Sequence, residues 1–253
     1  MTGLSGKHAL VTGGGSGVGA AIAHALAGAG CKVTITGRNA AALDAVKAAD
    51  ERIRPAVADV TDPEALAKAV ASATDGDGQL HLVIANAGIA ESQPFSKLDL
   101  EQWQRMIDVN LTGVFNTFKA ALPCMRNVKD GRMVAIASTA GLQGGGYISA
   151  YSASKHGVVG LVRSLAVELG PRGITVNAVC PGYIDTPMTS RTLDNISAKT
   201  GMSHADATQH LLKDVPTGRL IAPGEVAGAV LWLCSDLAAS VNGETVVMDG
   251  GQP

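Results

Sequence analysis

The sequence has few aromatic residues, little net charge and no long hydrophobic run. Phe, Tyr and Trp make up 3% of the 253 residues, whereas 46% are hydrophobic and 31 are glycine. Small side chains and many tight turns suit the close packing of a parallel sheet. No stretch approaches the ~20 apolar residues of a transmembrane helix, and the first residues lack the basic segment and apolar run of a secretory signal. We therefore expect a cytoplasmic protein with no membrane partner.

The charge balance argues against a nucleic-acid-binding protein, and the scattered cysteines and histidines argue against a metal or redox site. The formal net charge is −2, so nothing indicates nucleic acid or an anionic membrane as a partner. The four cysteines lack the spacing of a metal or redox motif, and we interpret them as reduced core thiols. The six histidines form no ligand cluster, and we expect His204 and His210, in a polar stretch, to be solvated. We predict no metal site.

A glycine-rich turn lies between a predicted strand and a predicted helix near the N-terminus. Residues 8–11 are apolar, residues 12–19 read TGGGSGVG, and a helical pattern follows from Val18 to about Ala27. Such a turn lets backbone N–H groups approach a pyrophosphate at the start of a helix. The lysine and hydroxyl residue of a P-loop are missing, so an NTPase is not indicated. A loop without a ligand remains the alternative.

Apolar strands alternate with helical patterns along the chain, and no repeat or linker divides it. The predicted strands are 8–11, 32–36, 54–60, 80–85, 133–137, 174–179 and 244–248. This order predicts an α/β fold: a single Rossmann-type domain over 1–253, with a doubly wound parallel sheet flanked by helices on both faces. Residues from about 186 to 214 are polar. We expect them to form one or two short helices, as a lid over a site at the carboxyl ends of the strands.

A phenol and an ammonium group stand four residues apart in the run Tyr151-Ser-Ala-Ser-Lys155. Residues at this spacing share one face of a helix. A free phenol has a pKa of about 10, and a nearby cation lowers that value, which would suit it to proton transfer near pH 7. Ser138 follows the apolar run 133–137, and the glycine-rich segment 141–146 is long enough to fold Ser138 back toward Tyr151. The Tyr-x-x-x-Lys pattern alone also occurs by chance.

Taken together, these motifs resemble those of the short-chain dehydrogenase/reductase family. The resemblance covers nearly the whole chain and is carried by Gly13, Gly17 and Gly19 of the turn, the Asn-Ala-Gly run at 86–88, Ser138, Tyr151, Lys155 and the Pro-Gly turn at 181–182. It implies an oxidoreductase that interconverts a ketone and a secondary alcohol by hydride transfer with a nicotinamide cofactor. Ser138 would bind the carbonyl oxygen, and Tyr151 would act as general acid or base. Lys155 would lower the pKa of Tyr151 and hold the nicotinamide ribose.

The resemblance also implies a fourth catalytic residue and a set of cofactor contacts. Asn110, in a predicted helix that Asp99 opens, would anchor a proton-relay water. Asp59 would contact the adenine, although its carboxylate could equally cap the following turn. The implied cofactor contacts are Gly13, Ser16, Gly17, Val18, Gly19, Arg38, Asp59, Val60, Asn86, Ala87, Gly88, Tyr151, Lys155, Pro181, Gly182, Ile184 and Thr186.

Arg38 favours NADP(H) over NAD(H) as the cofactor. It follows the second predicted strand, where the adenosine ribose should lie. NAD sites usually carry an acid at this point, and Gly37 provides none. A guanidinium group can pair with the 2′-phosphate of NADP in bidentate fashion. Arg38 could instead stack on adenine without discriminating, so an NAD-dependent secondary alcohol or hydroxyacyl dehydrogenase is the alternative.

The overall pattern looks most like 3-oxoacyl-thioester and polyketide ketoreductases, which implies an acyl thioester as one substrate class. A non-catalytic dinucleotide-binding protein is a rival, but it has no need of Asn, Ser, Tyr and Lys together. An epimerase or dehydratase of this fold is usually longer. The resemblance further implies a homotetramer, and the predicted helices near 111–118 and 158–169 carry apolar residues on more than one face. Deep burial within one subunit would explain those faces equally well.

Overall fold

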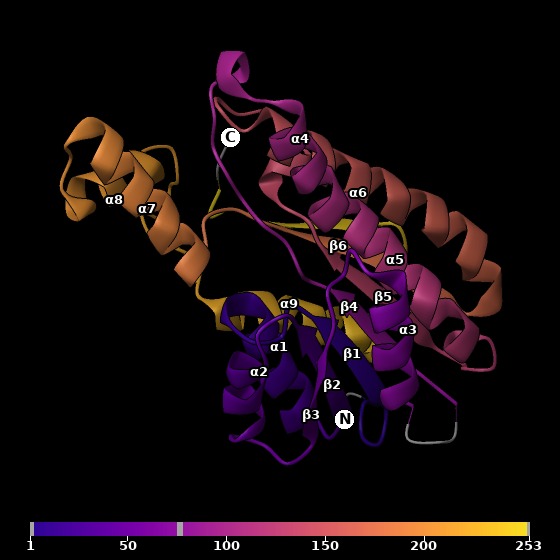
Figure 1. Cartoon of the computed structure of the whole chain (residues 1–253). Coiled ribbons are helices and arrows are strands. Elements are labelled where there is room, and N and C mark those ends of the chain that lie inside the picture. Colours follow the sequence, from indigo (N-terminus) through magenta and orange to yellow (C-terminus); the bar gives the residue numbers. More distant parts are fainter. Residues whose placement is uncertain (1–2, 75–77, 252–253) are drawn as a thin grey trace.

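The computed structural model describes residues 3–74 and 78–251. Seven parallel strands form one sheet in the order β3-β2-β1-β4-β5-β6-β7 (Figure 1). They are β1 (His8–Thr12), β2 (Lys32–Gly37), β3 (Ile53–Val57), β4 (Leu82–Ala85), β5 (Gly131–Ile136), β6 (Ile174–Pro181) and β7 (Thr245–Met248). The strand order reverses between β1 and β4, which creates the switch point where ligands bind in doubly wound sheets. The predicted Rossmann-type fold is confirmed.

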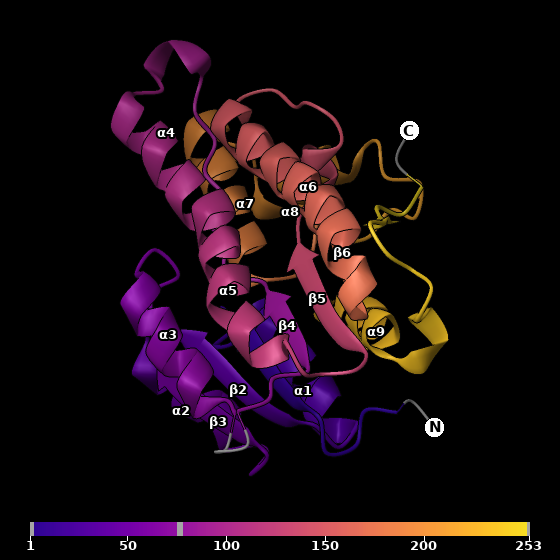
Figure 2. The same cartoon turned by 90° about the vertical axis from the view of Figure 1, so that its right-hand side faces the viewer.

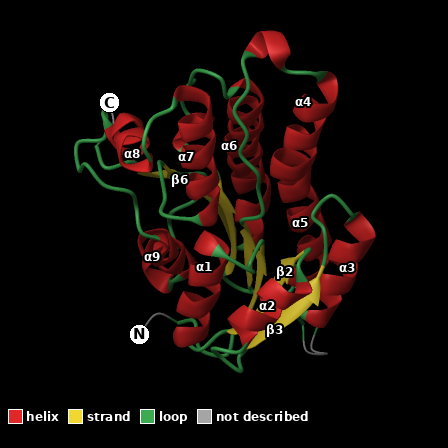
Figure 3. Cartoon of the chain, turned by 60° about the vertical axis from the view of Figure 1, so that its left-hand side comes forward, coloured by secondary structure: helices red, strands yellow, loops and turns green. Residues whose placement is uncertain are grey.

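Two layers of helices cover the two faces of the sheet. One layer holds α1 (Gly17–Gly28), α2 (Ala40–Lys47) and α9 (Pro223–Cys234), which lie in front of the strands in Figure 3. The other holds α3 (Pro63–Ser72), α4 (Leu100–Ile107), α5 (Gly113–Ala121) and α6 (Ser149–Leu169), which come forward in Figure 2. Successive strand residues serve opposite layers: Leu10 packs toward α5 and α6, and Val11 toward α1 and α9. The strands are therefore apolar on both faces, as a parallel sheet between two layers requires.

Two helix starts are fixed by their capping residues. Asp62 accepts hydrogen bonds from the backbone N–H of Glu64 and Ala65, and Pro63 occupies the first helical position of α3. Asp99 and Gln102 form a reciprocal capping box at the start of α4. No helix in the described ranges is both long and apolar enough to cross a membrane.

The predicted lid segment contains two helices, α7 (Pro187–Thr200) and α8 (His204–Leu212). Gly201 separates them with a φ of +75°, a left-handed conformation that suits glycine. Figure 1 shows the pair standing apart from the two layers, beyond the carboxyl ends of the strands. The prediction of one or two short helices in this segment is confirmed.

Two predicted elements differ from those observed. The third strand ends at Val57 instead of continuing to Val60, because the Asp59 carboxylate accepts from the N–H and hydroxyl of Thr61 and turns the chain. The predicted helix that Asp99 opens is interrupted by a π-helical turn, Asp108–Thr112, between α4 and α5. Such turns insert one extra residue into a helix and often mark functional sites.

Candidate functional site

A cavity of about 1090 Å³ opens at the carboxyl edge of the sheet. All the predicted site residues line it except Asn110. They arrive from the ends of six strands, from the start of α6 and from the segment before α7. The fold thus brings together residues that lie far apart in the sequence, at the expected switch point.

The glycine turn is too compact for side chains. Gly13 has a φ of +66°, and a Cβ placed on it would lie 2.9 Å from the Cα of Ala87. A Cβ on Gly19 would lie 2.2 Å from the backbone oxygen of Gly13. Ser16, the N-cap of α1, makes no side-chain bond to the first helical turn, and that turn carries no acidic residue. Its N–H groups therefore remain available to an anion, as a pyrophosphate site requires.

Asn86 braces the sheet beside this turn. Its Nδ2 donates to the backbone oxygens of Thr12 and Gly13 at 2.9 and 3.2 Å. In return, the hydroxyl of Thr12 accepts from the backbone N–H of Asn86 and Ala87 at 3.0 and 3.1 Å. These four bonds join the end of β4 to the end of β1 and hold the cavity floor in place.

Arg38 and Asp59 lie together at the far end of the cavity. Arg38 Nη1 is 3.9 Å from Asp59 Oδ2, and the Arg38 side chain is 75% exposed. The other Asp59 oxygen accepts from Thr61, so Asp59 does cap the turn, which leaves Oδ2 for a second partner. A Cβ on Gly37 would come no closer than 3.5 Å to its nearest neighbour, Leu43. Arg38 is thus loosely held and has room to turn toward a ligand.

Ser138 and Tyr151 bring their hydroxyl groups together in the middle of the cavity. Ser138 is buried directly after β5, and its Oγ accepts from the N–H of Ala140 at 3.1 Å. Tyr151 lies in the first turn of α6, as the sequence predicts. Burial raises the pKa of the Tyr151 phenol, and its contact with the Ser138 side chain offsets part of that rise. The phenol therefore stays protonated at neutral pH.

Lys155 lies one turn further along α6 and is 4% exposed. Its Nζ is 5.8 Å from the centre of the Tyr151 ring and donates to the backbone oxygen of Ile136 at 2.8 Å. Burial lowers the pKa of Lys155 to about 8. We expected Lys155 to lower the pKa of Tyr151, but the net shift is upward, because burial of the phenol dominates.

Asn110 lies behind the cavity wall in the π-helical turn and is fully buried. Its Oδ1 accepts from the N–H of Ile89 at 2.8 Å, and its Nδ2 donates to the oxygen of the same residue at 2.9 Å. A Cβ on Gly88 would lie 3.2 Å from Asn110 Oδ1 and 3.6 Å from Lys155 Nζ. Gly88 therefore lies close to both side chains, and a larger residue there would crowd them.

The family model described as "Enoyl-(Acyl carrier protein) reductase" matches residues 13–252. The chain belongs to the short-chain dehydrogenase/reductase family. It is 37% identical over 251 residues to the 3-oxoacyl-[acyl-carrier-protein] reductase FabG of Escherichia coli (strain K12), covering 98% of each chain. It is 35% identical over 254 residues to the D-beta-hydroxybutyrate dehydrogenase of Rhizobium meliloti (strain 1021), covering 97% of this chain and 98% of the relative.

A solved structure shows the same likeness. A tryptophan variant of actinorhodin polyketide ketoreductase, solved with NADPH, superposes with a TM-score of 0.93 at 35% identity, covering 100% of this chain and 99% of the other. This short-chain dehydrogenase/reductase is therefore an oxidoreductase of the kind that acts on CH–OH and ketone groups.

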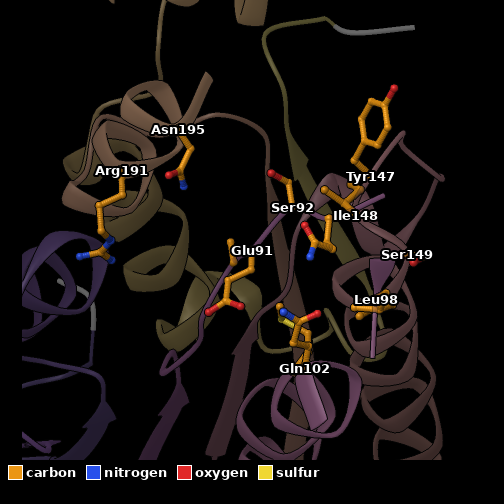
Figure 4. Close-up of a pocket in the computed structure, with 13 residues that line it drawn as sticks. Glu91, Ser92, Leu98, Gln102, Tyr147, Ile148, Ser149, Arg191 and Asn195 are labelled. Carbon is orange, nitrogen blue, oxygen red and sulfur yellow. The ribbon is translucent and has the colours of Figure 1, made fainter. Parts of the chain in front are cut away.

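A second cavity of about 360 Å³ adjoins the first, and no motif in the sequence predicted it (Figure 4). The loop after β4, the start of α6 and helix α7 each contribute to its lining. Tyr147 has a φ of +65°, and its backbone oxygen accepts from the N–H of Gln93 at 2.8 Å, which joins two of these segments. A non-glycine residue in this conformation often marks a functional site. In the sequence, the one signal for this cavity was the closeness of Tyr147 to Tyr151.

Proposed function

We propose that this enzyme is an NADP-linked ketoreductase in which Ser138, Tyr151 and Lys155 handle the substrate oxygen. The observation that carries the proposal is the grouping of the three side chains in one cavity with the glycine turn. The bound cofactor would supply or accept the hydride. The remaining chemistry, which is to orient the carbonyl and to move one proton, falls to these side chains.

The hydrogen bonds support a separate role for each hydroxyl group. Ser138 Oγ accepts from Ala140 and contacts the Tyr151 phenol, so its proton can turn from the phenol to a substrate carbonyl oxygen bound beside both groups. Tyr151, protonated at neutral pH, gives its proton to the same oxygen during reduction and takes it back during oxidation. The Lys155 cation lies near enough to stabilise the phenolate that forms. We also propose that Asn110 supports Lys155 from the π-helical turn. As the family resemblance implies, Asn110 would anchor a water that relays protons.

The residues present fit a nicotinamide dinucleotide. The bare first turn of α1 suits the pyrophosphate, and Asp59 and Val60 line the cavity where the adenine would lie. We propose backbone contacts from Asn86, Ala87 and Gly88 to the nicotinamide ribose. The segment after β6 would meet the nicotinamide and neighbouring oxygens through Pro181, Gly182, Ile184 and Thr186.

The preference for NADP is supported by Arg38. Its weak contact with Asp59 costs little to break, and no acid stands at position 37 to repel a phosphate. The structural relative solved with NADPH is consistent with this preference. The alternative is an NAD-linked hydroxyacyl or secondary alcohol dehydrogenase, in which Asp59 keeps Arg38 engaged.

The substrate class is supported by the size of the cavities and by the relatives. Relatives named as reductases of 3-oxoacyl carrier proteins and of polyketides suggest that acyl thioesters are among the ketones to test. We propose that α7 and α8 act as the lid over the bound substrate. The test is a panel of ketones and 3-oxoacyl thioesters, assayed by nicotinamide absorbance with NADPH and NADH. Absence of turnover with every ketone would refute the enzyme we propose.

We also propose a homotetramer. Exposed apolar side chains occur on two separate parts of the surface: Phe115 and Val167 on α5 and α6, and Trp232 and Leu237 on and just after α9. Two separate apolar surfaces suit two kinds of subunit contact. Light scattering at micromolar concentration distinguishes a tetramer from a monomer.

We propose a reducing, cytoplasmic location for the protein. The free state of all four cysteines supports this proposal.

A further inference from the structure

Arg191 lies at the junction of the two cavities without a protein partner. It belongs to the first half of α7 and lines both the main cavity and the smaller one. Within residues 3–74 and 78–251, its guanidinium makes no ion pair or hydrogen bond. Among the described residues, it is also the one cationic side chain lining the smaller cavity. A cation placed in this way is available to an anionic ligand.

The acidic residue in the lining of the smaller cavity does not compete for Arg191. Glu91 faces this space, but Arg105 Nη2 donates to both of its carboxylate oxygens, one at 2.6 Å. This ion pair neutralises Glu91 from outside the cavity. The described lining therefore carries a single uncompensated positive charge, which matches a ligand with a single negative charge.

The rest of the lining suits a short carbon chain. In Figure 4, Arg191 and Asn195 lie on one side of the space, while Leu98 and Ile148 lie on the other. Asn195 is one helical turn beyond Arg191, so its amide can assist on the same face of α7. Ile148 is close in sequence to Tyr151, so the cavity adjoins the proton donor. A ligand can thus keep its ketone at Tyr151 and its charged end at Arg191.

We propose that Arg191 binds a carboxylate of the substrate and makes the enzyme selective for ketones that carry one. This inference rests on the proposed ketoreductase function and narrows its substrate class. The planar guanidinium matches a carboxylate in bidentate geometry. Because Arg191 belongs to the predicted lid segment, a bound carboxylate would also draw α7 toward the site.

The test compares oxo acids with their uncharged esters. The probes are 3-oxobutanoate, 4-oxopentanoate and 5-oxohexanoate, each paired with its methyl ester, at saturating NADPH. Wild type should show at least a ~10-fold higher kcat/KM for one of the acids than for its ester. Arg191→Gln should lower the acid's kcat/KM by about 10–100-fold, mainly through KM, because a hydrogen bond to a charged group is lost. The ester should be unaffected, and Arg191→Lys should restore part of the loss.

Lys199→Gln is the matched control. Lys199 is on the same helix and lines the main cavity but not the smaller one, so its substitution removes the same charge elsewhere. Lys199→Gln should leave the ratio of kcat/KM for the acid to kcat/KM for the ester unchanged. If it lowers this ratio as much as Arg191→Gln does, the local role of Arg191 is overturned.

Three other results would overturn the proposal in distinguishable ways. If wild type reduces the esters as well as the acids, ketone reduction stands and the carboxylate site is wrong. If Arg191→Gln slows acid and ester equally and weakens NADPH binding, measured by fluorescence, the guanidinium serves the cofactor pyrophosphate instead. If wild type turns over none of the oxo acids, esters or thioesters, the proposed ketoreductase function fails together with the inference.

Discussion

The Lys155 ammonium group lies 5.8 Å from the centre of the Tyr151 ring; Lys155 is buried and Tyr151 is half-buried. Burial shifts the two groups in opposite directions, raising the pKa of Tyr151 and lowering that of Lys155 to about 8. Both shifts favour the neutral forms. At neutral pH the free enzyme therefore holds a protonated phenol beside a lysine that still keeps most of its charge.

This arrangement predicts the direction of the pH dependence. Lys155 is charged below its pKa of about 8 and neutral above it. We expect kcat/KM for ketone reduction to be level through neutral pH and to fall as the pH rises past that value. Alcohol oxidation needs the phenolate, so its kcat/KM should instead rise toward the raised pKa of Tyr151. Initial rates in both directions provide the check, and a reduction profile that stays level to about pH 10, the ordinary pKa of a phenol, would contradict it.

Removal of the phenolic hydroxyl should abolish proton transfer but leave the cofactor site intact. Tyr151→Phe is expected to lower kcat by at least ~10²-fold, the usual loss for a general acid. The NADPH dissociation constant, measured by fluorescence, should stay close to that of wild type. Lys155→Ala should lose turnover and also weaken NADPH binding. Near-normal turnover in Tyr151→Phe would refute the mechanism.

Asn110 should be as important for stability as for turnover. Asn110→Ala removes a fully buried amide and leaves the backbone N–H and oxygen of the half-buried Ile89 without their partner. We expect the free energy of unfolding in urea to fall by about 1–3 kcal/mol. Asn116→Ala is a suitable comparison and should cost less, since the buried Asn116 side chain donates to one backbone oxygen, that of Val60. A variant of Asn110 as stable as wild type would show that these bonds contribute little.

Periodicity and capping residues predicted most of the fold because they act locally. The apolar strands, the Asp99 capping box and the break at Gly201 each depend on neighbours a few residues away. The π-helical turn was missed because the bonds that its Asn110 makes to Ile89 join two separate segments, which no local pattern displays. The direction of the Tyr151 shift was missed for a similar reason. Burial is set by the whole cavity, whereas the sequence displayed only the nearby lysine.

The glycine turn and the Tyr151–Lys155 pair were easier to predict from the sequence than the smaller cavity with Arg191. The turn and the pair could be predicted, because each is a short pattern with fixed spacing along the chain. Arg191 could not, because its relation to Ile148 and Glu91 exists only after α7 has folded over the sheet edge.

Arg38 should set the preference between the two nicotinamide cofactors. Its side chain is 75% exposed and its Nη1 is 3.9 Å from Asp59 Oδ2, a contact too weak to hold the guanidinium away from a 2′-phosphate. We expect wild type to show a higher kcat/KM with NADPH than with NADH. In Gly37→Asp/Arg38→Leu, a carboxylate at position 37 repels the 2′-phosphate, and the guanidinium that would pair with the phosphate is gone. The preference for NADPH should therefore reverse or vanish.

The single variants separate the two causes of this preference. Gly37→Asp is sterically tolerable, because a Cβ there would lie 3.5 Å from Leu43, an ordinary contact. It should penalise NADPH by repulsion while Arg38 remains. Arg38→Leu should weaken NADPH alone, since NADH has no 2′-phosphate to lose. If Arg38→Leu instead weakens both cofactors equally, the guanidinium stacks on the adenine without reading the phosphate. A wild-type enzyme that prefers NADH would show that Asp59 keeps Arg38 engaged and that the NAD-linked alternative is correct.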